Sequence, residues 1–271
     1  MSAGAVDPRQ ALPVILAVTT REKGRELLRR AFTRRRARLT VVKGAAAADV
    51  ALRRVLVDAV VVDTAAGGED AWTAAAMARE FPSIPFFAVV APRIADAAAL
   101  GRCAALDLAD VLFEGIDDGA MRELVLPRAF TPRFAAALRD AHAVLGVQGS
   151  LQARAWELVT AAGGRPVRTD AIAAALGVTR EHLSRAFAAD GAPNLKRVID
   201  LVRLIAAAEL AKNPAYDLAD VARVLAFAST SHLANTAERV AGIRAASLTR
   251  LRARDLIARF TQGRARSRDS L

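Results

Sequence analysis

Residues 170–187 read DAIAAALGVTREHLSRAF, and residues 218–233 read LADVARVLAFASTSHL. The two stretches share apolar and turn positions at a constant offset of 49, with Ile172, Ala173, Leu176 and Gly177 matched by Val221, Ala222, Leu225 and Ala226. Each stretch predicts a short apolar helix, a tight turn and a second helix with a polar face. These are the parts of a helix-turn-helix. The chain is therefore expected to contain two such units in tandem.

The charge of the chain is concentrated in the half that holds the repeats. Residues 150–271 contain 19 Lys and Arg against 11 Asp and Glu, a net charge of +8, whereas residues 1–149 contain 20 against 17, a net charge of +3. In a helix-turn-helix the second helix enters the DNA major groove, and basic side chains contact the phosphates. Repeats and charge together predict a DNA-binding half. A general bias toward Arg and Ala is the alternative source of the charge.

Each second helix is expected to begin at a capping hydroxyl and to present polar residues to the groove. Thr179 caps the first, and Leu183 and Phe187 turn toward the core. Ser229 caps the second. The residues expected on the DNA side are Arg180, Glu181, Ser184 and Arg185 in the first unit, and Thr230, Ser231, His232 and Asn235 in the second.

Three of these side chains have specific partners among the bases. Arg185 suits guanine O6 and N7, Glu181 suits cytosine N4, and Asn235 suits adenine. One long helical pattern, from Asn194 to about Lys212, joins the two units and would hold them at a fixed separation.

Residues from about 165 to 250 resemble the DNA-binding domain of AraC/XylS-type transcription regulators. The resemblance rests on both units, on Arg203-Leu204 and Ala207-Ala208 in the joining helix, and on the pattern Ala222…Phe227…Ser231. It implies that the units occupy successive major grooves on one face of the DNA, with the eight residues named above facing the bases.

The second unit departs from this family pattern. Ala226 stands where Gly is usual, which would cost about 1 kcal/mol if φ is positive there. Leu233 and Ala237 replace the usual aromatic residues, and Asn235 stands where Arg is common. The second unit is therefore expected to bind more weakly, or chiefly through phosphates.

The first half alternates short apolar runs with helical patterns. Strands are expected at Val14–Val18, Leu39–Val42, Ala59–Val62, Phe86–Val90 and Val111–Phe113. Helices are expected at Glu22–Phe32, Ala46–Val55, Ala71–Phe81, Ile94–Leu106 and Ala120–Leu126. Nearly continuous apolar strands separated by helices predict an α/β doubly wound, five-stranded parallel sheet of order 2-1-3-4-5, followed by an all-α tandem helix-turn-helix domain.

This half resembles the receiver domain of response regulators. Asp63 ends the third strand, at the place of the family's phosphoacceptor. The other family positions do not match, because Thr19 and Thr20 replace the Mg²⁺-binding acidic residues, Ala91 replaces Ser or Thr, and Glu114 stands near the usual Lys. Phosphoryl transfer needs a cation beside the acceptor. We therefore expect a degenerate pseudo-receiver in which Asp63 is a vestigial phosphoacceptor or simply caps the strand.

Between the halves, Thr131-Pro132 predicts a helix start, and Phe134, Leu138, Ala141 and Leu145 form one apolar stripe. The stripe is either a dimer seam or packs on its own domain. The expected divisions are residues 1–126 for the pseudo-receiver, 127–149 for a connector helix and hinge, 150–260 for the DNA-binding domain and 261–271 for a basic disordered tail.

The remaining residues indicate no chemistry. The single Cys103 is expected to be a small buried hydrophobe, and the three histidines, His142, His182 and His232, lie outside the α/β half. No Gly-rich phosphate loop follows the first strand. We expect no enzymatic activity, metal or cofactor, no membrane span or signal peptide, and a cytoplasmic, nucleoid-associated location. The run Arg34-Arg35-Arg36-Ala37-Arg38 is either a solvated loop or a contact to DNA or a partner.

These features predict a sequence-specific, DNA-binding transcription regulator with a phosphorylation-independent regulatory or dimerisation domain. The expected partners are double-stranded DNA, a second copy of the chain through the receiver-like domain or the connector helix, and RNA polymerase. Two alternatives remain: a nonspecific nucleoid-associated protein, and a partner-binding module whose DNA-binding units have decayed.

Overall fold

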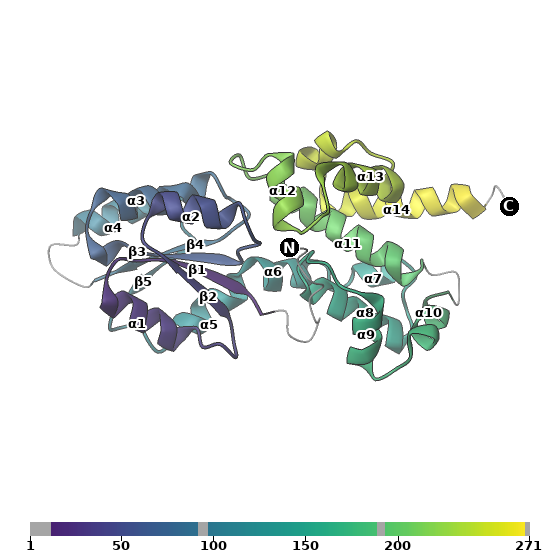
Figure 1. The fold of residues 1–271 in the computed structure, drawn as a ribbon, viewed down its shortest axis with the longest axis horizontal. Helices are drawn as coiled ribbons and strands as arrows, with labels where there is room; N and C mark the ends of the chain where they lie inside the picture. The colour runs from purple at the N-terminus through teal and green to yellow at the C-terminus, as the bar shows by residue number, and fades with distance from the viewer. Residues whose placement is uncertain (1–11, 92–96, 189–192, 269–271) are drawn as a thin grey trace. The chain divides into compact units, whose positions relative to one another are not determined.

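A computed structural model describes residues 12–91, 97–188 and 193–268. The chain divides into two compact units (Figure 1). The N-terminal unit consists of Leu12–Arg133 with Asn213–Ala215, and the C-terminal unit consists of Phe134–Lys212 and the described residues from Tyr216 onward. The start of the helix expected from Ile94 and the last residues of the expected tail, 269–271, lie outside the described residues.

Five parallel strands form the centre of the N-terminal unit, in the order β2-β1-β3-β4-β5. Their bounds are Val14–Val18 for β1, Arg38–Val42 for β2, Ala59–Asp63 for β3, Phe86–Val90 for β4 and Asp110–Phe113 for β5. The helices are α1 Glu22–Ala31, α2 Ala45–Leu52, α3 Glu69–Ala76, α4 Ala97–Ala104 and α5 Met121–Val125. Short 3-10 turns lie at Thr64–Ala66, Met77–Arg79 and Leu126–Arg128. The predicted fold class and strand order are confirmed.

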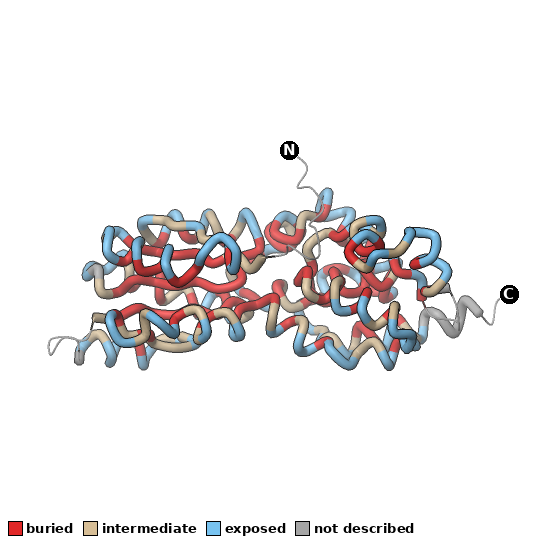
Figure 2. Tube along the Cα trace, turned by 90° about the horizontal axis from the view of Figure 1, so that it is seen from below, coloured by how far each residue is buried: buried red, intermediate tan, exposed pale blue. Residues whose placement is uncertain are grey.

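The helices cover both faces of this sheet, which is why its central strands are apolar throughout. Helices α1 and α5 cover one face, and α2, α3 and α4 cover the other (Figure 1). Leu28 of α1 and Val125 of α5 belong to the core cluster on the first face. Trp72 of α3 and Cys103 of α4 belong to the cluster on the second. Figure 2 shows the strands as the buried centre of the unit.

Because all the strands run parallel, the residues that follow β1, β3 and β5 emerge at one edge of the sheet.

Cys103 lies within a helix and is buried, and burial raises the pKa of its thiol. It therefore behaves as the small buried hydrophobe that the sequence predicts.

The C-terminal unit is built from helices around one central helix. The bounds are α6 Phe130–Ala137, which begins just before the unit, α7 Ala141–Val144, α8 Ser150–Ala161, α9 Thr169–Leu176, α10 Arg180–Ala188, α11 Leu195–Leu210, α12 Leu218–Val224, α13 Thr230–Ala241 and α14 Ala253–Arg268, with a 3-10 segment at Ala245–Arg250. Helix α11 is buried on nearly every side from Leu201 to Leu210. Its 16 residues correspond to about 24 Å of helix.

The connector differs from expectation. In place of one helix, α6 and α7 are separated at residues 138–140. Phe134, Leu138 and Leu145 are buried, and the indole N–H of Trp156 donates to the Leu138 carbonyl at 3.0 Å. The stripe therefore packs within the chain, so it does not offer the dimer seam that the sequence left open.

The C-terminal end also differs from expectation. Helix α14 runs through Arg268, so the segment from 261 to 268, expected to be disordered, is helical. Among the described residues, none of the helices combines the length and the apolar composition needed to cross a bilayer.

Candidate DNA-binding interface and the Asp63 cluster

The first helix-turn-helix consists of α9, a turn at Gly177 and α10. Gly177 adopts φ 72° and ψ 30°, the left-handed conformation that a residue without Cβ accepts most readily. The Thr179 hydroxyl accepts the N–H of His182 at 3.1 Å and so caps α10. Leu183 and Phe187 are fully buried. The buried pair fixes the rotation of α10 and leaves its opposite side to solvent.

The second unit repeats this geometry through α12, Ala226 and α13. In the first turn Gly177 N–H donates to the Ala174 carbonyl and Val178 N–H to Ala173; in the second, the same two bonds run from Ala226 to Arg223 and from Phe227 to Ala222. Donors and acceptors all differ by 49 positions, so the sequence repeat is a structural repeat. Ala226 has φ 51° and is the one non-glycine residue with positive φ in the described part of the chain. The strained position expected from the sequence is present.

The eight predicted base-facing residues are all exposed, on α10 and at the start of α13. Within the described residues, neither Arg180 nor Arg185 has a hydrogen-bond or ion-pair partner, so both guanidinium groups are available to a ligand. The Ser229 hydroxyl accepts the N–H of His232 at 3.0 Å and caps α13. No contact with DNA tests the assignment, so it stays a prediction.

His232 differs from the other seven because its ring already has local partners. Its Nδ1 accepts the N–H of Ala228 at 3.3 Å, and the ring lies edge-on to Phe227, with 5.5 Å between centroids. One ring nitrogen is thus committed to the turn, and only Nε2 is left for a base or a phosphate.

Arg203 of α11 holds the second turn in place. Its guanidinium donates to the carbonyls of Leu225 at 2.9 Å and Ala226 at 3.3 Å, and it lies 4.0 Å from the centroid of the Phe227 ring. Burial lowers the pKa of Arg203, but a guanidinium group keeps its charge in proteins. The sequence identified Arg203 only through the family resemblance. The buried donor role was missed, because nothing in the sequence links α11 to residues 225–226.

The second site of interest is at the carboxyl edge of the sheet, around Asp63. The Asp63 carboxylate is buried and accepts from Arg21, with Nε to Oδ2 at 2.9 Å and one terminal nitrogen to Oδ1 at 2.6 Å. The Thr19 hydroxyl donates to the same Oδ2 at 2.6 Å. A Cβ on Gly24 would lie 2.2 Å from Oδ2, so only glycine lets α1 approach this closely. Both oxygens of Asp63 are therefore occupied.

Glu114, directly after β5, belongs to the same cluster. Its Oε2 lies 3.0 Å from Arg21, and its Oε1 lies 2.9 Å from the ammonium group of Lys23. Burial raises the pKa of Glu114, but the hydrogen bonds from Lys23 and Arg21 outweigh it and leave the pKa below the ordinary 4.5. The hydrogen bond to Asp63 chiefly raises the pKa of Arg21, against an opposing effect of burial.

The cluster inverts the charges of the receiver pattern. Where that family has acidic residues after the first strand and Lys after the fifth, this chain has Arg21 and Lys23 after β1 and Glu114 after β5. The sequence predicted Thr19, Asp63 and Glu114 at this edge but missed both cations. The available signal was that a buried carboxylate requires a charged or hydrogen-bonded partner.

Comparison with known proteins supports the C-terminal assignment. Residues 172–251 match the family model described as a helix-turn-helix domain. Among solved structures, full-length FixJ from B. japonicum is similar over 86% of this chain and 98% of the FixJ chain, at 15% sequence identity and a TM-score of 0.37. No curated protein matches.

The C-terminal unit thus contains a helix-turn-helix domain, and the N-terminal unit is a doubly wound parallel sheet.

Proposed function

We propose that the chain is a sequence-specific transcription regulator that places its two helix-turn-helix units in successive major grooves of one DNA face. The observation that carries the proposal is the repeated turn at Gly177 and Ala226, followed in both units by a capped helix with an exposed polar face. A capped second helix with a buried inner side and a free outer side is the geometry by which such units read base edges.

The first unit is proposed to supply most of the specificity. Arg180 and Arg185 both carry the guanidinium group that pairs with guanine at two points, and Glu181 and Ser184 lie beside them on α10. In the second unit, Thr230, Ser231 and Asn235 offer neutral hydrogen-bonding groups, and His232 has one free ring nitrogen. We infer that the second unit contributes fewer base contacts and relies more on the DNA backbone.

The N-terminal unit is proposed to act without phosphorylation. The guanidinium of Arg21 donates to both oxygens of Asp63, and these hydrogen bonds lower the reactivity of the carboxylate toward a phosphoryl donor. A divalent cation is also disfavoured, since Arg21 and Lys23 would repel it at the position where acidic ligands are needed. The unit then serves as a regulatory or dimerisation module through its surface.

The test is selection of bound fragments from a random DNA pool with the full chain. The expected result is a motif in two blocks whose centres lie about one helical turn, or 10–10.5 base pairs, apart. Recovery of unrelated sequences that are lost in competition with random duplex would favour a nonspecific nucleoid-associated protein. A chain that retains no duplex at all would favour a module with decayed DNA-binding units.

A further inference from the structure

The N-terminal unit carries an arginine-rich segment that the proposed function does not use. Residues 29–38 contain six arginines and no acidic residue, although residues 1–149 as a whole have a net charge of only +3. All six side chains are exposed, at the end of α1, in the following loop and at the start of β2. β2 is also an edge strand of the sheet, because its described partner is β1 alone. This segment is a concentrated positive surface with unpaired backbone beside it.

Part of the segment borders a hollow of about 630 Å³ beside the end of α1 and β2. Its lining combines cations with apolar groups, from Arg29, Phe32, Arg34, Ala37, Arg38, Leu39 and Val41. Phe32 and Ala37 are buried, and Leu39 and Val41 are half-buried against the core. None of these lining residues is acidic. An ordinary solvated arginine loop needs neither a hollow nor an apolar floor.

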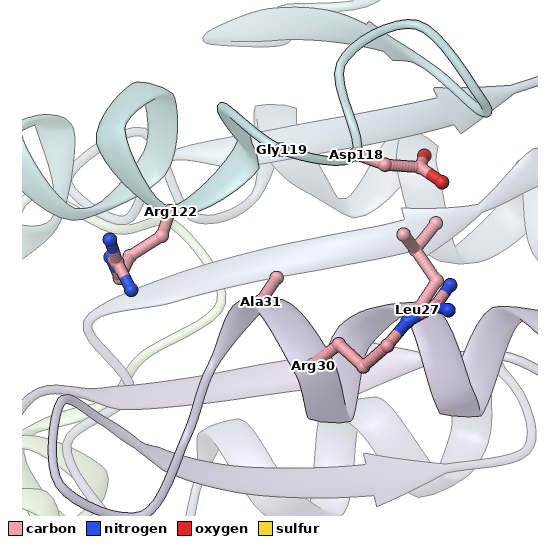
Figure 3. A pocket seen from close by; sticks show the side chains of 6 residues that line it. All are labelled: Leu27, Arg30, Ala31, Asp118, Gly119 and Arg122. Carbon is pink, nitrogen blue, oxygen red and sulfur yellow. The ribbon is translucent and has the colours of Figure 1, made fainter.

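A second hollow, of about 350 Å³, offers a comparison. It lies between α1 and the start of α5, with Arg30 on α1 and Arg122 on α5 (Figure 3). Asp118 also lines it, and its carboxylate accepts the N–H of Gly115 at 2.7 Å. A fixed negative charge in the lining opposes an anion there. The first hollow has no such opposition.

We propose that the first hollow binds a small organic anion with an apolar body. Within the described residues Arg34 and Arg38 have no ion-pair partner, and Arg29 has only Glu22, at 3.8 Å. Guanidinium groups bind carboxylate and phosphate heads in two-point geometry, while Leu39 and Val41 offer apolar surface to the body of the ligand. The volume falls within the range of about 300–1,000 Å³ typical of small-molecule sites.

Duplex DNA fits this surface less well, because phosphates would contact the arginines and leave the apolar floor uncovered. In the proposed regulator, the anion bound in this hollow is the signal that the N-terminal unit senses. Only this signalling role rests on the proposed function. The binding of the anion is inferred from the residues that line the hollow alone.

The experiment uses the full chain and 8-anilinonaphthalene-1-sulfonate, a fluorescent anion with an aromatic body. The double variant Arg34→Gln with Arg38→Gln is compared with Arg35→Gln with Arg36→Gln, which removes the same charge from neighbouring residues outside the lining. We expect at least a tenfold loss of affinity in the first variant and less than threefold in the second. In the wild-type chain, octanoate displaces the probe, whereas acetate and 1-octanol at the same concentration do not.

Several outcomes would overturn the proposal. An equal loss of probe affinity in the two double variants would show that the probe responds only to the general positive charge. An unchanged affinity in both variants would show that the probe binds outside the hollow. Displacement by a random duplex, with loss of duplex affinity in the Arg34/Arg38 variant, would show a DNA surface instead. Even if a variant fails to fold, the competition by octanoate, acetate and octanol in the wild-type chain tests whether binding requires both an anionic head and an apolar body. Failure of the DNA selection would refute the proposed function but leave this binding result unaffected.

Discussion

Ala226 and Gly177 occupy equivalent turns in the two repeats, and they provide a matched test of backbone strain. Both have positive φ, at 51° and 72°, but only Ala226 carries a Cβ. An L residue in this conformation destabilises the folded state by about 1–2 kcal/mol, which glycine would avoid. Glycine also increases the conformational entropy of the unfolded chain, which lowers the free energy of unfolding by about 0.4–1 kcal/mol. The difference predicts that Ala226→Gly stabilises the C-terminal unit by about 0.5–1 kcal/mol.

The reverse substitution, Gly177→Ala, is expected to destabilise the unit by a similar amount. A Cβ at Gly177 meets no heavy atom within 4 Å, so its cost is the backbone conformation alone. For a unit of this size, each kcal/mol shifts the unfolding temperature by about 2–4 °C. The sites belong to different turns, so the double variant is expected to melt near the wild type.

The assay is thermal unfolding of the full chain, followed by the fluorescence of the buried Trp156 in a Trp72→Phe background. That background leaves one tryptophan, in the C-terminal unit. Ala174→Gly is the control, because the same chemical change inside helix α9 is expected to lower the unfolding temperature. If Ala226→Gly also lowered the unfolding temperature, the positive φ of Ala226 would not be a source of strain in the second turn.

Arg185→Ala should weaken binding to the selected DNA by about 1–3 kcal/mol, or roughly 5–150-fold, in a fluorescence anisotropy titration. An equal loss on random duplex would contradict base recognition. A small-molecule phosphodonor with Mg²⁺ should leave Asp63 unmodified by mass spectrometry, and a labelled Asp63 with altered DNA affinity would show that Arg21 does not block the site. The lowered pKa of Glu114 means that its stabilising effect is complete above pH 4.5, its ordinary pKa, and is lost as the pH falls further through its folded pKa. Glu114→Gln should flatten this acid dependence in denaturant titrations that follow Trp72 fluorescence in a Trp156→Phe background. Arg203→Met should destabilise the C-terminal unit by about 2 kcal/mol or more, because buried carbonyls lose their donor, and an unchanged denaturation midpoint would show that water replaces it.

Much of the fold follows from local pattern. β1 and β4 begin and end at the predicted residues, because continuous apolar runs bounded by polar turns specify buried parallel strands. The caps at Thr179 and Ser229 also occur as predicted, since a hydroxyl before a helical pattern satisfies a free backbone N–H. These features depend on residues within a few positions of each other.

The features that the sequence did not predict depend on contacts between distant segments. The connector divides into α6 and α7, with Trp156 bonded to the Leu138 carbonyl at the break between them. Arg21 pairs with a carboxylate 42 positions away. The hydrophobic periodicity of a sequence predicts which side of a helix or strand is apolar. It does not predict which distant polar group an arginine will contact.

The charge inversion around Asp63 has a consequence for how this domain can evolve. Arg21→Asp alone would crowd three carboxylates into one buried site, and Glu114→Lys alone would set three cations against a single acid. Either first step is unfavourable until the other is made. The charges at positions 21 and 114 are therefore coupled, and a change of sign at one position is tolerated only together with the opposite change at the other.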